Sequence, residues 1–528
     1  MAHLLSLKLV CLILFFSFSP SSASQYDLIN KVCKASKDPQ ACQAWMLSNS
    51  STHLSPNATV LEAIQFALKL TTNNLKTGQH LVKRILHDSK GNQNRTNTAL
   101  ICREVLGYSK YRIHMVVPAL KSHELMKDAR AWMSAALMYQ YDCWSGLKYV
   151  NGTQFVDDTM AFLNSTLIQG SSSALGMIVN YDLYGVETQK WSPPKTERDH
   201  FWEPESHISK WGYPAGLKEN VSVCKTKGRV RCTYETVQAA VDASPNNTEL
   251  GNWFVIRIKN GNYSETVRVP LEKKNVVFWG EGKGKTVITG SKNVGQLGMS
   301  TYNSSTVGVV GDGFMAINLT IENTAGSDAH QAVAFRSDSD KSVMINCEFI
   351  GNQDTLYAHT LRQYYKSCTI QGNVDFIFGN AAAVFQDCLI LLVTRNLLAT
   401  KKDLIKNVVT AQGRIDPGQS TGFVFRNSLV NGTQAYMDKK TRGKWVTFLG
   451  RPWKEYSRTV FIECTLDGLI SEEGWLAWKD DFAFKTLYYG EYKNTGPGSS
   501  LAKRVNWSNP IPKDHVKSYS PQNFIQLN

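Results

Sequence analysis

Ile345-Asn-Cys-Glu-Phe-Ile-Gly-Asn-Gln-Asp354 is followed by Lys366-Ser-Cys-Thr-Ile-Gln-Gly-Asn-Val-Asp375, and the two segments nearly repeat each other. When their cysteines are aligned, the Gly-Asn pairs coincide and so do the closing aspartates, which are 21 residues apart. A repeat of about 20 residues is typical of a solenoid, in which equivalent residues of successive turns lie about 4.8 Å apart. The repeat therefore predicts that Asp354 and Asp375 are stacked on one face of a solenoid.

The same pattern recurs along the C-terminal half, residues 226–528. Short β-rich runs are separated by Gly and Asn, and in each run a polar residue precedes a Cys, Ser or Leu. These runs are Ala316–Ile321, Met344–Phe349, Tyr365–Ile370, Phe385–Ile390, Phe425–Val430 and Phe461–Leu466. They predict an all-β parallel β-helix, in which each turn packs on the next. The alternative, a β-sandwich, is disfavoured because hairpin Asn-Gly turns do not separate the runs regularly.

The N-terminal residues 24–186 follow a helical period instead. Leu61, Ile64 and Leu68 fall on one stripe, and a second stripe comprises Val156, Met160, Leu163 and Leu167. Several such stripes with short polar breaks predict an all-α, antiparallel helical bundle. Residues 187–225 are interrupted by prolines and glycines, and we interpret them as a linker.

The first residues predict the secretory route. Residues 1–23 contain one lysine, the apolar run Leu9–Phe18 and the small residues Ser21-Ser22-Ala23, which is typical of a signal peptide cleaved after about Ala23. The apolar run is too short to span a bilayer as an uncleaved anchor, so we expect no membrane association. Asn-x-Ser/Thr sequons follow, among them Asn57, Asn94, Asn151, Asn164, Asn262, Asn303 and Asn431.

The length of the chain indicates more than one domain, and its net charge limits the classes of molecule that it would bind. A chain of 528 residues exceeds one ordinary domain. The net charge of +14 and the pI near 9.1 suit nucleic acid, an anionic membrane or an acidic polymer. Because we expect a secreted, extracellular protein, nucleic acid is excluded and an extracellular polyanion is favoured.

The cysteines are expected to be oxidised in that compartment. Ten of the 11 follow the signal peptide, and none has the spacing of a zinc site, so we expect no metal. Cys347, Cys368, Cys388 and Cys464 share one position of the repeat. Stacking permits either a Cys347–Cys368 or a Cys368–Cys388 disulfide and does not choose between them.

Two carboxylates about 5 Å apart do not both ionise freely, so Asp354 and Asp375 are expected to have different pKa values. One proton donor beside one anion is the pairing that acid–base and nucleophilic catalysis require. Alternatively, the two aspartates are polar turn residues, or they share a cation such as calcium.

The helical half resembles the plant invertase/pectin methylesterase inhibitor family. The resemblance rests on Val32-Cys33 with Cys42, on Ala99-Leu-Ile-Cys102, and on Trp132-Met-Ser-Ala-Ala-Leu137 leading to Cys143. It implies a four-helix bundle with the disulfides Cys33–Cys42 and Cys102–Cys143, and an inhibitor-like domain as an intramolecular partner.

The C-terminal half resembles plant pectin methylesterases. Five motifs occur in order: Gly261-Asn-Tyr-Ser-Glu265, Gln331-Ala-Val-Ala-Phe-Arg336, Gly351-Asn-Gln-Asp-Thr-Leu356, Asp375-Phe-Ile-Phe-Gly379 and Leu449-Gly-Arg-Pro-Trp453. The resemblance implies a right-handed parallel β-helix that removes methyl esters from homogalacturonan in the cell wall, without a cofactor. It also implies a Cys368–Cys388 disulfide.

The motifs carry expected roles. By position, Asp375 matches the nucleophile that forms an acyl-enzyme, and Asp354 matches the acid that protonates methanol and then the base that activates water. Gln331 and Gln353 match the amides that stabilise the oxyanion.

The resemblance also implies substrate binding by Arg451, Trp453, Gln331 and Thr301. A guanidinium suits a carboxylate, and an indole face suits a sugar ring. Three other aromatic residues are candidates to line the cleft, namely Tyr357, Trp475 and Trp478. For each of them alone, the expected role is packing in the core.

The linker departs from many relatives, which carry a basic tetrad where the helical domain is removed. Here the basic residues are the isolated Lys195, Arg198 and Lys210. Cys224 and Cys232, which lie at the entry to the C-terminal half, are expected to close a local disulfide hairpin.

Two other functions remain open from the sequence. A lyase or hydrolase of the β-helix class would cut the pectin chain without releasing methanol. A non-enzymatic inhibitor or wall-binding protein would act through residues 24–190 alone.

Overall fold

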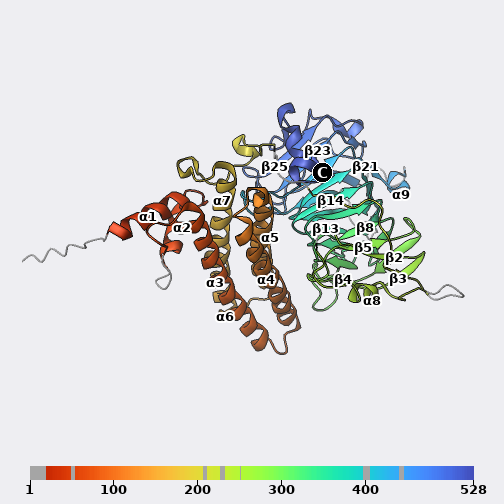
Figure 1. The fold of residues 1–528 in the computed structure, drawn as a ribbon. Coiled ribbons are helices and arrows are strands. Elements are labelled where there is room, and N and C mark those ends of the chain that lie inside the picture. The colour runs from red at the N-terminus through yellow and green to blue at the C-terminus, as the bar shows by residue number, and fades with distance from the viewer. Residues whose placement is uncertain are drawn as a thin grey trace, which may run out of the picture.

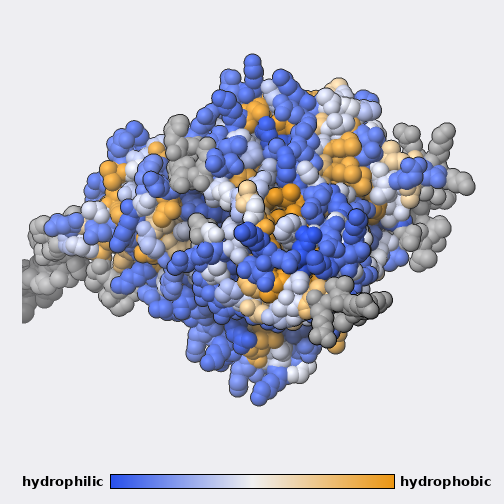
Figure 2. Space-filling view, turned by 45° about the vertical axis from the view of Figure 1, so that its right-hand side comes forward, coloured by the Kyte–Doolittle hydropathy of each residue, from blue (hydrophilic) through white to orange (hydrophobic). Residues whose placement is uncertain are grey.

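The computed structural model describes residues 20–48, 54–205, 211–225, 232–249, 251–395, 405–438 and 445–528. A helical N-terminal part stands beside a β-rich C-terminal part (Figure 1). The expected signal peptide, residues 1–23, falls largely outside the described residues. Within them, no helix is long and apolar enough to cross a membrane. The face shown in Figure 2 is largely hydrophilic, with scattered apolar patches.

The helical part is a four-helix bundle, as predicted. Its long helices are α3 (Val60–Asp88), α4 (Gln93–Ala119), α5 (Met126–Leu147) and a fourth that runs from α6 (Gln154–Phe162) through a π-helical segment (Leu163–Ile168) into α7 (Gln169–Tyr184). Two shorter helices precede the bundle, α1 (Pro20–Cys33) and α2 (Pro39–Leu47). The disulfides Cys33–Cys42 and Cys102–Cys143 both form.

Local sequence explains where these helices begin. Thr59 and Glu62 form a reciprocal capping box at α3, and the Asn92 side chain accepts the Arg95 N–H at the start of α4. The predicted stripes are buried at Ile64 and Leu68, and also at Val156, Leu163 and Leu167. Burial of one stripe per helix builds the core of the bundle.

In the described part of the C-terminal half, the strands form three parallel sheets. The first contains β1 (Val221–Val223), β2 (Phe254–Ile258), β5 (Val276–Trp279), β8 (Met315–Ile317), β11 (Ser342–Ile345), β14 (Arg362–Lys366), β17 (Ala382–Gln386), β20 (Gly422–Arg426), β23 (Arg458–Ile462), β25 (Tyr488–Tyr492) and β26 (Asn509–Pro510).

The other two sheets complete each turn of the right-handed β-helix. The second contains β4 (Val267–Val269), β7 (Val307–Val309), β10 (Phe335–Ser337), β13 (Leu356–Ala358), β16 (Val374–Gly379), β19 (Ile405–Gln412) and β22 (Trp445–Gly450). The third contains β3 (Gly261–Ser264), β6 (Thr286–Gly290), β9 (Thr320–Asn323), β12 (Glu348–Ile350), β15 (Thr369–Gly372), β18 (Leu389–Leu392), β21 (Leu429–Gly432) and β24 (Thr465–Leu466).

The register of the first sheet confirms the sequence repeat. Partners across successive turns are the predicted equivalents, namely Ala316, Met344, Tyr365, Phe385, Phe425 and Phe461. Four of these rings stack in a column, with centroids 4.7 Å apart for Tyr365 and Phe385, 4.6 Å for Phe385 and Phe425, and 4.5 Å for Phe425 and Phe461. The column links consecutive turns through the core.

The polar residue of each run has a conformational role. At the corner between the first and third sheets, φ lies between 46° and 55° at Asn318, Asn346, Ser367, Asp387, Asn427 and Glu463. Asn and Asp tolerate this left-handed region better than most residues, which explains their recurrence in the pattern.

The Cys368–Cys388 disulfide implied by the resemblance is wrong for this structure. Cys347, Cys368, Cys388 and Cys464 are all free and buried. The thiol of Cys368 donates to the Met344 carbonyl at 3.4 Å, and that of Cys388 donates to the Tyr365 carbonyl at 3.5 Å. Their thiols therefore bond to the backbone of the preceding turn, and no disulfide joins them.

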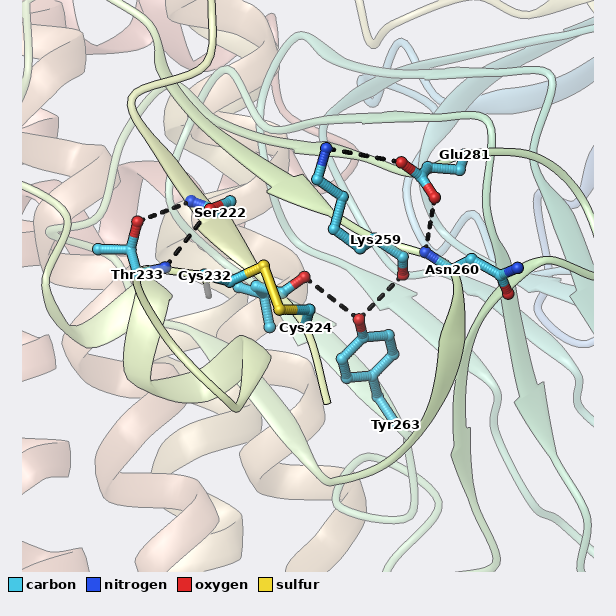
Figure 3. Close-up of a disulfide and its surroundings, with 9 residues drawn as sticks. Ser222, Cys224, Cys232, Thr233, Lys259, Asn260, Tyr263 and Glu281 are labelled. Carbon is cyan, nitrogen blue, oxygen red and sulfur yellow. Dashed lines mark hydrogen bonds and ion pairs between the residues drawn. A yellow bond between two sulfur atoms is a disulfide. The ribbon is translucent and has the colours of Figure 1, made fainter. Parts of the chain in front are cut away.

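The expected Cys224–Cys232 disulfide is present at the beginning of the β-helix (Figure 3). Beside it, the Tyr263 hydroxyl contacts the carbonyls of Val223 at 3.2 Å and Lys259 at 2.9 Å. The disulfide thus ties the end of β1 to Cys232, and the Tyr263 hydroxyl links the same end of β1 to the residue after β2.

The linker lies folded against the β-helix. Glu197 is buried and accepts a hydrogen bond from Arg458 at 2.8 Å. Arg198 donates to the carbonyls of Leu487, Phe484 and Trp507. Of the isolated basic residues, Arg198 is therefore bound to the β-helix, whereas Lys210 lies outside the described residues.

Candidate active site

Asp354 and Asp375 lie on adjacent turns of the β-helix, as the repeat predicts. The 21-residue register is seen in the pairing of Ile345 with Lys366, and the Asp354 N–H donates to the Val374 carbonyl at 3.1 Å. Both aspartates have a left-handed backbone, with φ of 62° and 49°, at equivalent corners. Their side chains are almost buried, with 7% and 6% exposure. The fold therefore brings two desolvated carboxyl groups together.

Arg451 distinguishes the two aspartates. Its Nε donates to Asp375 Oδ1 at 2.8 Å and its Nη2 donates to Asp375 Oδ2 at 2.5 Å. No hydrogen bond to the Asp354 carboxyl group is found among the described residues. Burial raises the pKa of both aspartates. The charge of Asp375 raises the pKa of Asp354 further. The charge of Arg451 opposes the rise at both aspartates, and at Asp375 its hydrogen bonds oppose it as well.

Asp354 consequently retains its proton more readily than Asp375. The bidentate guanidinium makes Asp375 the better-stabilised anion. The pair thus combines a proton donor with an anion in one buried site, which is the combination that acid–base and nucleophilic catalysis require.

Gln331, Gln353 and Thr301 line the same cavity as the two aspartates. The Ala332 N–H donates to the Gln353 carbonyl at 3.2 Å, which places the two glutamines on neighbouring turns. Neither glutamine side chain has a hydrogen-bond partner in the part of the chain that the structure describes. Both amides are therefore free to donate to a ligand.

Trp453 forms an aromatic wall of this cavity. It packs edge-on against Phe378, with centroids 5.9 Å apart. A Cβ on Gly413 would lie 2.7 Å from the Trp453 ring, so the close approach of the backbone requires glycine there. Arg451 lies over the ring of Trp478 at 4.4 Å.

Packing was the expected role of the other aromatic residues, and it holds for Trp475, which is 1% exposed and stacks on Tyr489. Tyr357 packs on Phe378 and also lines the cavity. Trp478 lines the cavity and is 38% exposed, so packing alone does not describe it.

The helical bundle covers this site. The cavity has a volume of about 920 Å³, and its opposite wall includes Asn97 and Ile101 of α4 and Asp142 of α5. The apolar core of the bundle continues into Tyr302 and Val333 of the β-helix. In Figure 1, α4 and α5 are the long helices nearest to the β-helix.

Charged and polar contacts join the two parts around the cavity. Arg112 of α4 holds Asp312 with two hydrogen bonds, at 2.6 and 2.7 Å. Three residues of α5 make further contacts with the β-helix. Asp128 forms an ion pair with Arg362 at 2.6 Å, and Asp142 forms one with His359 at 2.9 Å. The indole N–H of Trp132 donates to Asp340 at 2.9 Å. Sequence reasoning identified none of these pairs. His359 lies only five residues after Asp354, but no repeat or spacing marks it.

Among the described residues, no group of three or more His, Cys, Asp or Glu side chains could hold a metal ion.

Comparison with known proteins gives two family matches. Residues 220–528 match the pectinesterase family, and residues 27–177 match the plant invertase/pectin methylesterase inhibitor family.

Individual relatives cover most of the chain. An Arabidopsis thaliana protein described as a probable pectinesterase/pectinesterase inhibitor is 54% identical over 508 residues, which is 94% of this chain and 83% of that protein. A Citrus sinensis pectinesterase is 37% identical over 97% of this chain and 93% of its own length. Among solved structures, pectin methylesterase from carrot is 44% identical with a TM-score of 0.55, covering 60% of this chain and 95% of the carrot chain.

Proposed function

Because the chain belongs to the pectinesterase family and carries a plant invertase/pectin methylesterase inhibitor domain, we propose that Asp375 and Asp354 are the groups with which it hydrolyses methyl esters of pectin. The enzyme is a carboxylic ester hydrolase, whose products are pectate and methanol. One observation carries the assignment of roles, which is that Arg451 forms an ion pair with Asp375, whereas no described residue forms one with Asp354.

The proposed reaction begins with attack by an Asp375 oxygen on the ester carbonyl. The side-chain amides of Gln331 and Gln353 donate to the oxyanion of the tetrahedral intermediate. Asp354 gives its proton to the departing methanol, and an anhydride links the substrate acyl group to Asp375. Asp354, now ionised, takes a proton from water, which hydrolyses the anhydride and restores both aspartates.

Substrate binding is assigned to Arg451, Trp453 and Thr301, all of which line the cavity. The Trp453 ring provides a face for a galacturonate ring. Arg451 holds Asp375 and is itself only a quarter exposed, so it borders the reacting ester.

The proposal includes the organisation and location of the chain. Residues 1–23 are a signal peptide, 24–186 the inhibitor-like bundle, 187–225 the linker and 226–528 the catalytic β-helix. Plant pectinesterases act in the cell wall, and secretion would bring this enzyme to its polymer.

The test of this function is methanol release from methylated pectin, measured together with chain length. An esterase releases methanol and leaves the polymer length unchanged. A lyase or hydrolase would shorten the polymer, and a non-enzymatic inhibitor would do neither. Shortening without methanol would overturn the proposal.

Replacing Arg451 by methionine is expected to shift the acidic limb of the kcat/KM profile upward by about one pH unit or more. The guanidinium opposes the rise in the pKa of Asp375, so its loss raises that pKa and protonates the nucleophile at higher pH. Arg451→Lys, which retains the charge without the bidentate contact, should shift the limb less. An unchanged acidic limb in the methionine variant would contradict the role of Arg451.

The bundle is proposed to restrict access of polymeric pectin, since α4 and α5 form one wall of the catalytic cavity. Arg112, which is fully buried against Asp312, is the test position. Because breaking a buried ion pair costs about 3 kcal/mol, Arg112→Met should weaken docking and increase methanol release at least about tenfold.

The matched control is Arg103→Met, which changes an exposed arginine on the same helix. It should leave methanol release within about twofold of that of the unmodified chain, as most surface substitutions do. If folded Arg112→Met enzyme is no more active than this control, the bundle does not restrict the site.

A further inference from the structure

Asp142 of α5 reaches into the catalytic part of the chain. Its Oδ2 lies 2.9 Å from Nε2 of His359, and it lines the cavity that contains Asp354 and Asp375. His359 is completely buried, and its Nδ1 bonds to Asp338 on the other side. The imidazole therefore turns one nitrogen toward the β-helix and the other toward the docked bundle.

Lys454 lies on the same wall of the cavity, directly after Trp453. Its ammonium group is 4.8 Å from the ring centre of Tyr141 and 4.7 Å from that of Trp453. Within the part of the chain that the structure describes, no carboxylate lies at ion-pair distance from this ammonium group. Arg451, the other cation that lines the cavity, is already paired with Asp375.

The adjacent residues Tyr141 and Asp142 thus place a ring against Lys454 and a carboxylate against the buried imidazole of His359. A galacturonate residue without its methyl ester carries the same two features, a six-membered ring and a carboxylate. Such residues lie beside methylated ones in a partly de-esterified chain.

We propose that Lys454 and His359 form a subsite for the free carboxylate of a de-esterified galacturonate, and that Asp142 occupies this subsite while the bundle is docked. The inference rests on the proposed function, because it takes pectin as the polymer. A cation beside the sugar-binding face of Trp453 provides what this carboxylate requires.

Both groups carry charge at the pH of the measurements. Burial lowers the pKa of Lys454 to about 8, although the carboxylate of Asp142 opposes the fall. Burial also disfavours the charged form of His359, but Asp338 and Asp142 outweigh it and raise the pKa of this group to about 9. At pH 6 the subsite therefore has two cationic groups.

The experiment measures binding to the full chain by calorimetry at pH 6, with Asp375→Asn in every variant to prevent turnover. The two probes are a fully de-esterified oligogalacturonate and its fully methylated, neutral counterpart. Asp142→Asn removes the competing negative charge at the subsite and is expected to bind the anionic oligomer about tenfold more tightly than the chain with Asp142. Adding Lys454→Gln should abolish that gain, whereas adding Lys454→Arg should retain most of it.

The methylated oligomer is the ligand control, and its affinity should change less than about twofold on Lys454→Gln, because it offers no charge. Asp128→Asn is the docking control, since it breaks another ion pair of α5, with Arg362. The proposal would be overturned if Lys454→Gln weakened the binding of both oligomers equally. It would also be overturned if Lys454→Gln left intact the tighter binding of the anionic oligomer that Asp142→Asn produces. It would also fail if Asp128→Asn gave the same gain as Asp142→Asn. Because binding is measured without turnover, these outcomes do not depend on whether methanol release confirms the roles of the aspartates.

Discussion

Asp375→Asn is expected to lower kcat for methanol release by about 10⁴-fold or more, because the amide has no anionic oxygen to attack the ester. The substitution conserves size and can still accept a hydrogen bond from Arg451, so the fold should persist. Methanol release from methylated pectin measures the effect, and circular dichroism checks the fold.

Asp387→Asn provides the matched control. Asp387 is an aspartate of the same solenoid with a left-handed backbone, and it pairs with Lys366 away from the cavity. Its replacement should leave kcat within about twofold, as is usual for a partly exposed position. Retention of more than about 1% of activity by Asp375→Asn would exclude the nucleophilic role, since covalent catalysis leaves far less.

The second large effect is expected for Asp354→Asn, which should reduce kcat by about 10² to 10⁴-fold through loss of general acid–base catalysis. Burial and the charge of Asp375 raise the pKa of Asp354, so its protonated form persists into the working pH range. Activity of the unmodified enzyme should therefore fall at high pH as Asp354 ionises.

In Asp354→Asn this alkaline fall should disappear, because the amide does not titrate. The pH profile of the residual activity of Asp354→Asn shows directly whether the alkaline fall is lost. A purely structural role of Asp354 would lower activity at every pH and leave the alkaline limb in place, and that outcome would contradict the assignment.

The sequence was sufficient to predict the β-helix, because each turn repeats a local pattern. Asn346, Ser367 and Asp387 fall at the same corner of successive turns, and the left-handed backbone there favours short polar residues. Register follows from this periodicity, and with it the stacking of Asp354 on Asp375.

The roles of the two aspartates could not be predicted from the repeat. They depend on Arg451, which is 76 residues from Asp375 in sequence and reaches it only when several turns have stacked. Family resemblance suggested Asp375 as the nucleophile, and the ion pair now provides a physical reason for the same choice.

The contacts between the helical bundle and the β-helix could not be predicted from the sequence either. Asp142 and His359 belong to different structural patterns, a helix and a β-helix corner, and nothing local relates them. The Cys368–Cys388 pairing was wrong for a related reason. A shared position in the repeat brings the two cysteines close, but proximity does not by itself form the S–S bond, and both thiols are free in the structure.

The hydrogen bond from the Asp354 N–H to the Val374 carbonyl has a consequence for the evolution of the enzyme. The distance between Asp354 and Asp375 follows the spacing of hydrogen-bonded strands, which is the same in every parallel sheet. It does not depend on which side chains fill the core. The interior can therefore diverge, at some cost in stability, without changing the distance over which the chemistry occurs. Insertion of a single residue inside one of the strands between the two aspartates is different, because it would reverse which side chains of that strand face outward beyond the insertion.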